Sequence, residues 1–127
     1  MTNPRIQFIF ALTSSILLAV NAPVHAQSQP EINATAAASA DKADQELTAT
    51  YQKLRASFKD DAQALASLDA AEQAWLDYRE KEAEFEASSD FGGSIYPLTV
   101  STIAQRLTEE RIKYLKDMIK NGAPDAP

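Results

Sequence analysis

The chain has 127 residues, and its 12 lysines and arginines against 18 aspartates and glutamates give a formal net charge of −6 at pH 7. This acidic balance argues against nucleic acid and anionic membrane surfaces as partners and favours cationic partners, although solubility alone also accounts for a charge of this size. The sequence contains no cysteine. A domain of this length must therefore build its core without disulfide bonds, which suits long helices.

The N-terminal segment has the features of a secretory signal peptide. Arg5 supplies the positive end, residues 8–20 form an apolar core, and residues 24–26 form a small-x-small cleavage site. The apolar run is shorter than the ~20 residues that span a bilayer comfortably. We therefore expect residues 1–26 to be cleaved after Ala26 and the product to be periplasmic or secreted; an uncleaved membrane tether is the alternative.

Cleavage would also remove the single histidine, His25. The remaining chain would then have neither histidine nor cysteine. Ser-His-Asp and Cys-His catalysis need those side chains, and so do the usual zinc sites. We therefore predict a binding protein rather than an enzyme, with no cofactor and no metal ion.

The first part of the remaining chain divides into a leader and a helix. Residues 27–40 are small and polar with little to bury, and we interpret them as a flexible leader. A helix is expected from about Asp41, where apolar residues at steps of four, three and four share one face: Leu47, Tyr51, Leu54 and Phe58. Asp60 is a candidate N-cap for the next helix.

A second and longer helix is predicted from Asp61 to Ser88. Its main apolar stripe consists of Leu65, Leu68, Ala71, Trp75, Tyr78 and Phe85, with Leu76, Arg79 and Ala83 along the edge. At ~1.5 Å per residue such a helix is about 40 Å long. It needs another helix beside it to bury that stripe.

A third helix follows a glycine-containing break. Adjacent glycines in residues 88–94 lose too much backbone entropy to continue a helix, and Pro97 suits the first turn of the next one. The stripe of this helix is Val100, Ile103, Leu107, Tyr114 and Met118, with Leu115 and Ile119 beside it. Gly122 and Pro124 indicate its end.

No alternating strand pattern appears in the sequence, so we predict an all-α fold. The expected architecture is a small antiparallel bundle: a helical hairpin over residues 61–120 with the shorter first helix packed across it. The folded domain would occupy residues 41–121, and residues 122–127 would form a C-terminal tail.

An ordered set of residues runs through the two long helices and the loop between them: Gln73, Trp75, Tyr78, Arg79, Glu82, Gly92, Gly93, Ser94, Thr108, Arg111 and Leu115. In this order and near this spacing they resemble the N-terminal domain of the LprI-type lysozyme inhibitor family, over about residues 43–118. The resemblance implies a helical inhibitor with a lysozyme as partner. It also places the family's two cysteines at Ala83 and Ile103, so a bridge worth ~3 kcal/mol in the chain-entropy model is missing here.

The best candidate for a partner-binding site is the tip, residues 91–96. Gly92 and Gly93 allow close backbone approach, Ser94 offers a hydroxyl group, and Phe91 and Tyr96 offer rigid aromatic surface. A lysozyme cleft holds two catalytic carboxyl groups, and a protruding tip of this composition could donate hydrogen bonds into it. The alternative is a plain helix turn whose aromatic residues cover the core.

Charged residues near the tip supply two further hypotheses. Glu82 and Glu86 belong to an acidic run that would complement a cationic partner, or would simply form a solvated helix end. Arg79 and Arg111 are expected to reach Glu82 or Glu110 across the two long helices. With Trp75 and Tyr78 they would form a structural network that fixes helix register, or alternatively a site for an anionic group.

Together these features predict an exported acidic helical binding protein. The resemblance implies that it inhibits a cationic lysozyme, or another cell-wall hydrolase, by protein–protein occlusion. The alternative is a periplasmic interaction or adaptor module that has no inhibitory activity. An enzyme that acts on glycans with carboxylates alone ranks behind both, because nothing in the sequence places two acids in an enclosed pocket.

Overall fold

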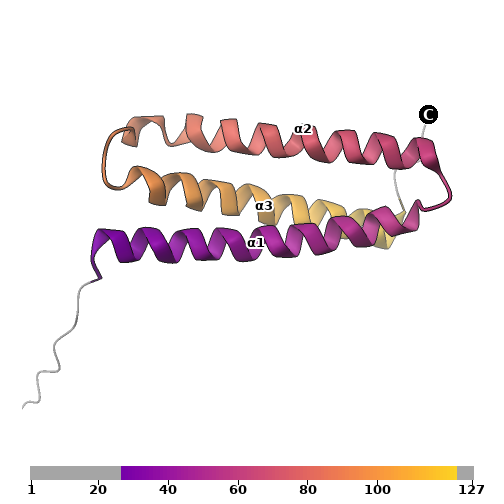
Figure 1. Ribbon diagram of the computed structural model, residues 1–127, viewed down its shortest axis with the longest axis horizontal. Coiled ribbons are helices and arrows are strands. Elements are labelled where there is room, and N and C mark those ends of the chain that lie inside the picture. Colours follow the sequence, from indigo (N-terminus) through magenta and orange to yellow (C-terminus); the bar gives the residue numbers. More distant parts are fainter. Residues whose placement is uncertain (1–26, 123–127) are drawn as a thin grey trace, which may run out of the picture.

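Figure 1 shows the computed structural model, which describes residues 27–122. Three α-helices follow one another: α1 (Gln29–Ser57), α2 (Ala62–Glu86) and α3 (Tyr96–Asn121), with a short 3-10 helix, η1 (Ser88–Asp90), after α2. No strand occurs within the described part of the chain, so the prediction of an all-α helical bundle is confirmed. The expected signal peptide and the end of the tail lie outside these residues.

The three helices lie side by side along the long axis of the molecule (Figure 1). α1 and α3 run in the same direction, and α2 runs antiparallel to both. α1 packs most extensively against α3. The expectation of a short first helix packed across the hairpin was therefore wrong, because α1 has 29 residues and follows α3 lengthwise.

The expected flexible leader over residues 27–40 was wrong for the same reason. α1 begins at Gln29, where the backbone N–H of Ser28 donates to the Glu31 carboxylate at 2.7 Å and Pro30 occupies the first turn. Alanine is the residue with the highest intrinsic helix propensity, and residues 31–40 are rich in alanine. The composition that indicated little to bury therefore also favoured a helix.

The ends of α2 and α3 lie close to their expected positions. The Asp61 side chain accepts a hydrogen bond from the Ala64 N–H at 2.9 Å, so Asp61 and not Asp60 caps α2. Pro97 lies in the first turn of α3, and Gly122 ends the helix with a φ of +83°.

The apolar core lies mainly between α1 and α3. Four residues form its centre: Leu47, Leu54, Ile112 and Leu115. Partly buried apolar residues pack around them: Tyr51, Phe58, Leu68, Trp75, Leu76, Met118 and Ile119. All four residues of the stripe predicted for the first helix belong to this core.

The stripes predicted for the other two helices were wrong at three aromatic residues. Tyr78, Phe85 and Tyr114 are exposed, with relative exposures of 50%, 71% and 50%. Instead, α2 turns Glu72 and Ala83 inward, and both are buried. The reason is that α2 buries a charged residue with an ionic partner on α3, and a pattern of apolar residues alone cannot reveal such a pair. None of the helices in residues 27–122 is long and apolar enough to cross a membrane.

Candidate functional site

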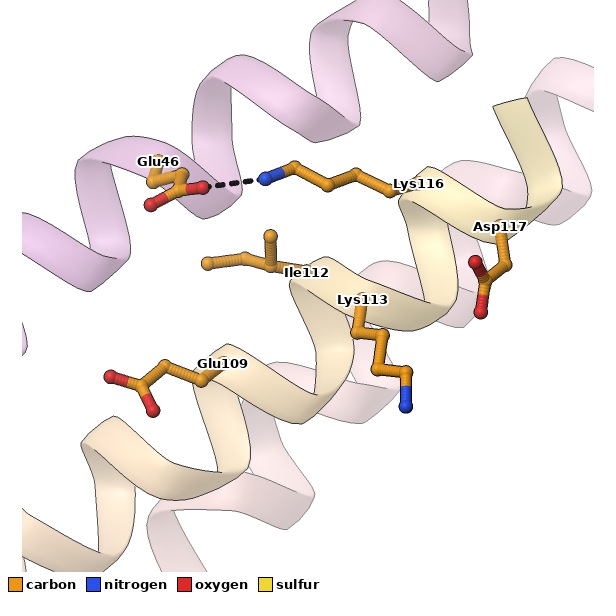
Figure 2. A pocket seen from close by; sticks show the side chains of 6 residues that line it. All are labelled: Glu46, Glu109, Ile112, Lys113, Lys116 and Asp117. Carbon is orange, nitrogen blue, oxygen red and sulfur yellow. Dashed lines mark hydrogen bonds and ion pairs between the residues drawn. The ribbon is translucent and has the colours of Figure 1, made fainter. Parts of the chain in front are cut away.

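A solvent-facing hollow of about 400 Å³ lies along α1 and α3 (Figure 2). Its lining residues are Glu46, Glu109, Ile112, Lys113, Lys116 and Asp117. The Lys116 ammonium binds the Glu46 carboxylate at 2.7 Å, while Lys113 and Asp117 point away from this pair. Two lysines against three acids give the hollow no strong preference for a charged ligand, and no nucleophile stands beside a base. The part of the chain that the structure describes holds no group of three metal-ligating His, Cys, Asp or Glu residues.

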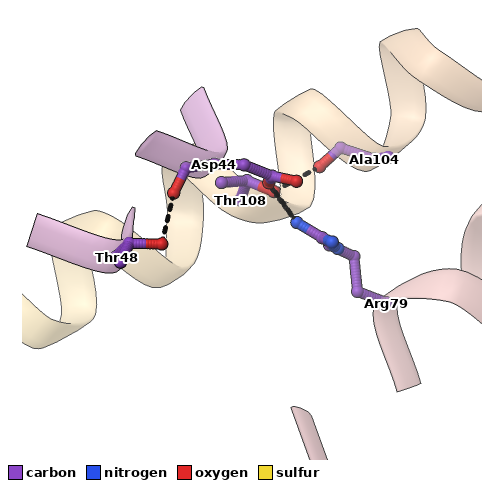
Figure 3. A network of polar contacts seen from close by, with 5 residues as sticks. All are labelled: Asp44, Thr48, Arg79, Ala104 and Thr108. Carbon is purple, nitrogen blue, oxygen red and sulfur yellow. Dashed lines mark hydrogen bonds and ion pairs between the residues drawn. The ribbon is translucent and has the colours of Figure 1, made fainter. Parts of the chain in front are cut away.

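Polar side chains from all three helices meet at a second place (Figure 3). Arg79 of α2 binds the Asp44 carboxylate of α1 and donates to the Thr108 hydroxyl of α3 at 2.8 Å. Thr108 is fully buried and donates in turn to the Ala104 carbonyl at 2.8 Å. Thr48, one turn after Asp44, donates to the Asp44 carbonyl at 2.9 Å. One guanidinium therefore links the three helices at a defined register.

A second guanidinium joins α2 to α3. Arg111 donates to one oxygen of the Glu72 carboxylate through two nitrogens, at 2.8 and 3.1 Å. The side chains of Arg111 and Glu72 are only 13% and 8% exposed. Trp75 lies between the two arginines, with the guanidinium carbons of Arg79 and Arg111 each 5.5 Å from its ring centre. Such cation–π contacts stabilise arginines whose charges are partly removed from water.

These contacts define the ion–aromatic network, which consists of Asp44, Glu72, Trp75, Arg79, Thr108 and Arg111. The expectation that Arg79 and Arg111 reach Glu82 or Glu110 was wrong, because their carboxylate partners are Asp44 and Glu72. Glu110 instead pairs with Arg106 one turn earlier on α3. Sequence reasoning missed Glu72 and Asp44, although the spacing of seven between Glu72 and Arg79 places both on one face of α2.

Two residues expected in the network lie outside it. Tyr78 is half exposed, and Glu82 is partly buried without taking part in either arginine pair. Glu86, expected to face a partner, is held by the Arg106 guanidinium of α3 at 2.7 and 3.0 Å. The carboxylate of Glu86 therefore has an ionic partner within the chain, at a solvent-exposed position.

The tip, residues 91–96, joins η1 to α3 and carries much exposed apolar surface. Phe91 is 79% exposed, and its ring meets Tyr96 edge to face at 5.4 Å between ring centres. Gly92 has a φ of +80° with open space around it, a backbone conformation that strains residues with a side chain. A Cβ on Gly93 would approach the Asp90 carbonyl oxygen to 3.1 Å, so this position also favours glycine.

Hydrogen bonds hold the tip in place from both sides. The Gly93 N–H donates to the Asp90 carbonyl at 2.9 Å, and the Thr99 hydroxyl donates to the Asp90 carboxylate at 2.6 Å. From α1, the Asn33 side-chain amide donates to the Ser94 carbonyl at 3.1 Å. The N-terminal part of α1, expected to be a flexible leader, thus braces the loop that carries Phe91.

The two positions that the resemblance assigns to cysteines carry apolar side chains. Ala83 is 1% exposed, and Ile103 on α3 is partly buried. At these two positions the helices are held by apolar packing and not by a disulfide bond. The cohesion of α2 with the other helices therefore rests on non-covalent contacts.

Comparison with known proteins identifies the family. The family model described as lysozyme inhibitor LprI matches residues 19–115. An uncharacterized protein of Rhizobium meliloti strain 1021 is 30% identical over 129 aligned positions, which cover 85% of this chain and 93% of that protein. The crystal structure of a DUF1311 family protein from Pseudomonas putida KT2440 superposes with a TM-score of 0.65 at 26% identity, over 72% of this chain and 93% of that one. The chain belongs to the LprI family.

Proposed function

We propose that this protein is an exported lysozyme inhibitor that occludes the cleft of the enzyme and performs no catalysis itself. The observation that carries the proposal is the match to the lysozyme inhibitor LprI family over residues 19–115. That match supports the proposed activity and the proposed class of partner. The geometry of the tip and the charge of the chain support a way in which it acts.

The tip is the part of the molecule best suited to enter a cleft. Phe91 presents most of its surface to solvent, and Ser94 is exposed beside it. Aromatic side chains of this kind often contribute most of the free energy of a protein–protein contact. Because Asn33 and Thr99 already hold the loop, binding would immobilise few additional groups, which lowers the entropic cost of association.

The chemistry of the tip also fits the cleft of a glycoside hydrolase. Such clefts contain two carboxyl groups, and the Ser94 hydroxyl is a hydrogen-bond donor that can meet one of them. The formal charge of −6 attracts a cationic enzyme and increases the rate of encounter at low salt. The tip would then make the direct contact with the enzyme, and the negative charge of the chain would increase the association rate.

The proposal is tested by lysis of a cell-wall suspension by a cationic lysozyme, followed as loss of turbidity in the presence of the purified protein. We expect stoichiometric inhibition that weakens as salt is added. The variant Ser94→Asp should inhibit about tenfold less well or worse, because its carboxylate would face the two acids of the cleft. The variant Ser67→Asp is the matched control, since it adds the same charge on an exposed position near the other end of α2.

Absence of inhibition by an excess of wild-type protein, with circular dichroism showing the helices intact, would contradict the proposal. The chain would then be an exported interaction module that acts on another partner. Equal inhibition by Ser94→Asp and wild type would be consistent with the proposed function but would show that the tip does not contact the enzyme.

A further inference from the structure

We propose that the outward side of α2, the helix that precedes the tip in the chain, is a second docking surface for a cationic protein. Its central residues are Tyr78 and Phe85, flanked by Asp77 and Glu84; these four residues are the α2 outer face. The proposal rests on the proposed function, because it assigns this face to the same lysozyme that the tip contacts. It adds a surface that neither the family match nor the tip requires.

The exposure of the two aromatic residues is the first argument. Tyr78 and Phe85 are 50% and 71% exposed, and a spacing of seven puts them on the same face of the helix, about 10 Å apart at ~1.5 Å per residue. A single exposed aromatic residue on a protein surface is unremarkable. Two in line on one helix form an exposed aromatic strip, and the 79%-exposed Phe91 follows in the loop after the same end of α2.

The reason for this exposure lies in the ion–aromatic network. α2 points Glu72 and Arg79 toward the other helices, and both side chains have ionic partners there. Because these charged residues occupy the inner face, Tyr78 and Phe85 are turned about a third of a helical turn or more away from it. The two aromatic residues therefore add nothing to the core centred on Leu54 and Leu115.

Charge indicates which partner fits. Between residues 77 and 86, Arg79 and Glu86 are engaged with Asp44 and Arg106. The carboxylates without a cationic partner in the described structure are Asp77, Glu80, Glu82 and Glu84, against the single ammonium of Lys81. Aromatic residues set among an excess of carboxylates suit a partner surface that is both apolar and positively charged.

The same charge argues against a second copy of this chain as the occupant. A symmetric dimer pairs a surface with itself. Two α2 outer faces brought together would place Asp77 and Glu84 of each copy against the same residues of the other. Like charges facing one another across an interface are unfavourable, so a cationic protein is the better occupant.

The test measures the affinity of the purified protein for a cationic lysozyme by isothermal titration calorimetry. Phe85→Ser should weaken binding about tenfold or more, as expected for loss of an aromatic residue that contributes much of a contact. The melting temperature should change little, because the side chain is mostly exposed. Tyr78→Ser should have the same direction of effect.

A charge-matched pair of double variants separates a local contact from the overall charge. Asp77→Asn with Glu84→Gln neutralises the α2 outer face. Glu109→Gln with Asp117→Asn removes the same charge from the hollow along α1 and α3 (Figure 2). The first pair should weaken binding and slow association markedly more than the second, because only the first pair would lie against the partner.

The possible outcomes are distinct. Wild-type binding that survives Phe85→Ser and the first charge pair unchanged overturns this inference and leaves the proposed function standing. A folded wild-type protein that neither binds nor inhibits lysozyme overturns both. A wild-type dimer in sedimentation that Phe85→Ser converts to a monomer also overturns the inference, because the face would then be covered by a second copy.

Discussion

α3 is joined to its two neighbours in different ways. Its contact with α1 is apolar and extensive, and Leu47, Leu54, Ile112 and Leu115 form the centre. Its contact with α2 combines apolar packing with polar links. The polar links are Arg111 with Glu72, Thr108 with Arg79 and Arg106 with Glu86.

The difference explains how the same small bundle can be cohesive and still present aromatic residues to solvent. Apolar packing between α1 and α3 supplies most of the hydrophobic stabilisation. The buried pair of Arg111 with Glu72 costs desolvation energy and contributes little net stability. We expect its main effect to be on the register in which α2 packs. With charged residues on its inner face, α2 directs Tyr78 and Phe85 outward.

The largest effect is expected from Arg111→Ala, which breaks the polar contact. Glu72 would remain buried without its partner, and such an uncompensated charge costs about 3–5 kcal/mol of unfolding free energy. Urea denaturation followed by circular dichroism measures this loss. A cost near that of an exposed ion pair, about 1 kcal/mol or less, would show that Glu72 does not depend on Arg111.

A double variant sharpens this experiment. Glu72→Leu with Arg111→Met replaces the ion pair by apolar side chains of similar size. Such replacements are often neutral or stabilising by about 1–4 kcal/mol, so the double variant should be more stable than Arg111→Ala. A double variant as unstable as the single one would mean that packing around Trp75, and not the unpaired charge, determines the loss.

The apolar contact is broken by Leu115→Ala. Leu115 is fully buried in the core between α1 and α3, and removal of such a side chain costs about 2–5 kcal/mol. Lys113→Ala on the exposed side of the same helix is the control, with an expected change within about 0.5 kcal/mol. Equal effects of the two substitutions on the urea midpoint would contradict the position of the core.

The connection from α1 to α2 is tested by Asp61→Ala. Loss of the hydrogen bond from the Ala64 N–H to the capping carboxylate should cost about 1 kcal/mol. Asp60→Ala is the matched control, because the neighbouring carboxylate makes no such bond in the described structure. A larger loss of melting temperature for Asp60→Ala would place the cap one residue earlier.

The smallest effect is expected at the exposed ion pair of Arg55 on α1 with Asp69 on α2. Arg55 and then Tyr51 hydrogen-bond the Asp69 carboxylate and lower its pKa below the usual value. A lowered folded-state pKa means that the stabilisation is present above about pH 4, where the unfolded side chain ionises, and is lost as the pH falls through the folded-state pKa. Asp69→Asn should therefore reduce the loss of stability that accompanies a fall in pH below about 4. If the stability of Asp69→Asn fell more steeply with decreasing pH than that of the wild type, the lowered pKa of Asp69 would be contradicted.

The apolar parts of the fold could be predicted from the sequence. The stripe of Leu47, Tyr51, Leu54 and Phe58 lies in the core as its spacing indicated, and Pro97 and Gly122 mark the ends of α3. Both signals are local, because they depend only on helical periodicity and on backbone preferences of single residues.

The polar parts could not be predicted in the same way. The pairing of Arg111 with Glu72 depends on how two helices are rotated toward each other, and the sequence offered Glu82 and Glu110 at equally plausible spacings. The helix over residues 29–40 was missed because alanine contributes little to a core and yet favours a helix. The tip, in contrast, was placed by its adjacent glycines, and Gly92 has the positive φ that such a sequence favours.

We expect the tip and the α2 outer face to bind a lysozyme together. Hydrogen–deuterium exchange of the purified protein, with and without a cationic lysozyme at saturating concentration, tests it most directly. We expect slower exchange for amides in residues 78–96, with little change along the hollow of α1 and α3 that contains Glu46 and Lys116. Protection confined to that hollow, or no protection in any helix or loop, would contradict binding by the tip and the α2 outer face.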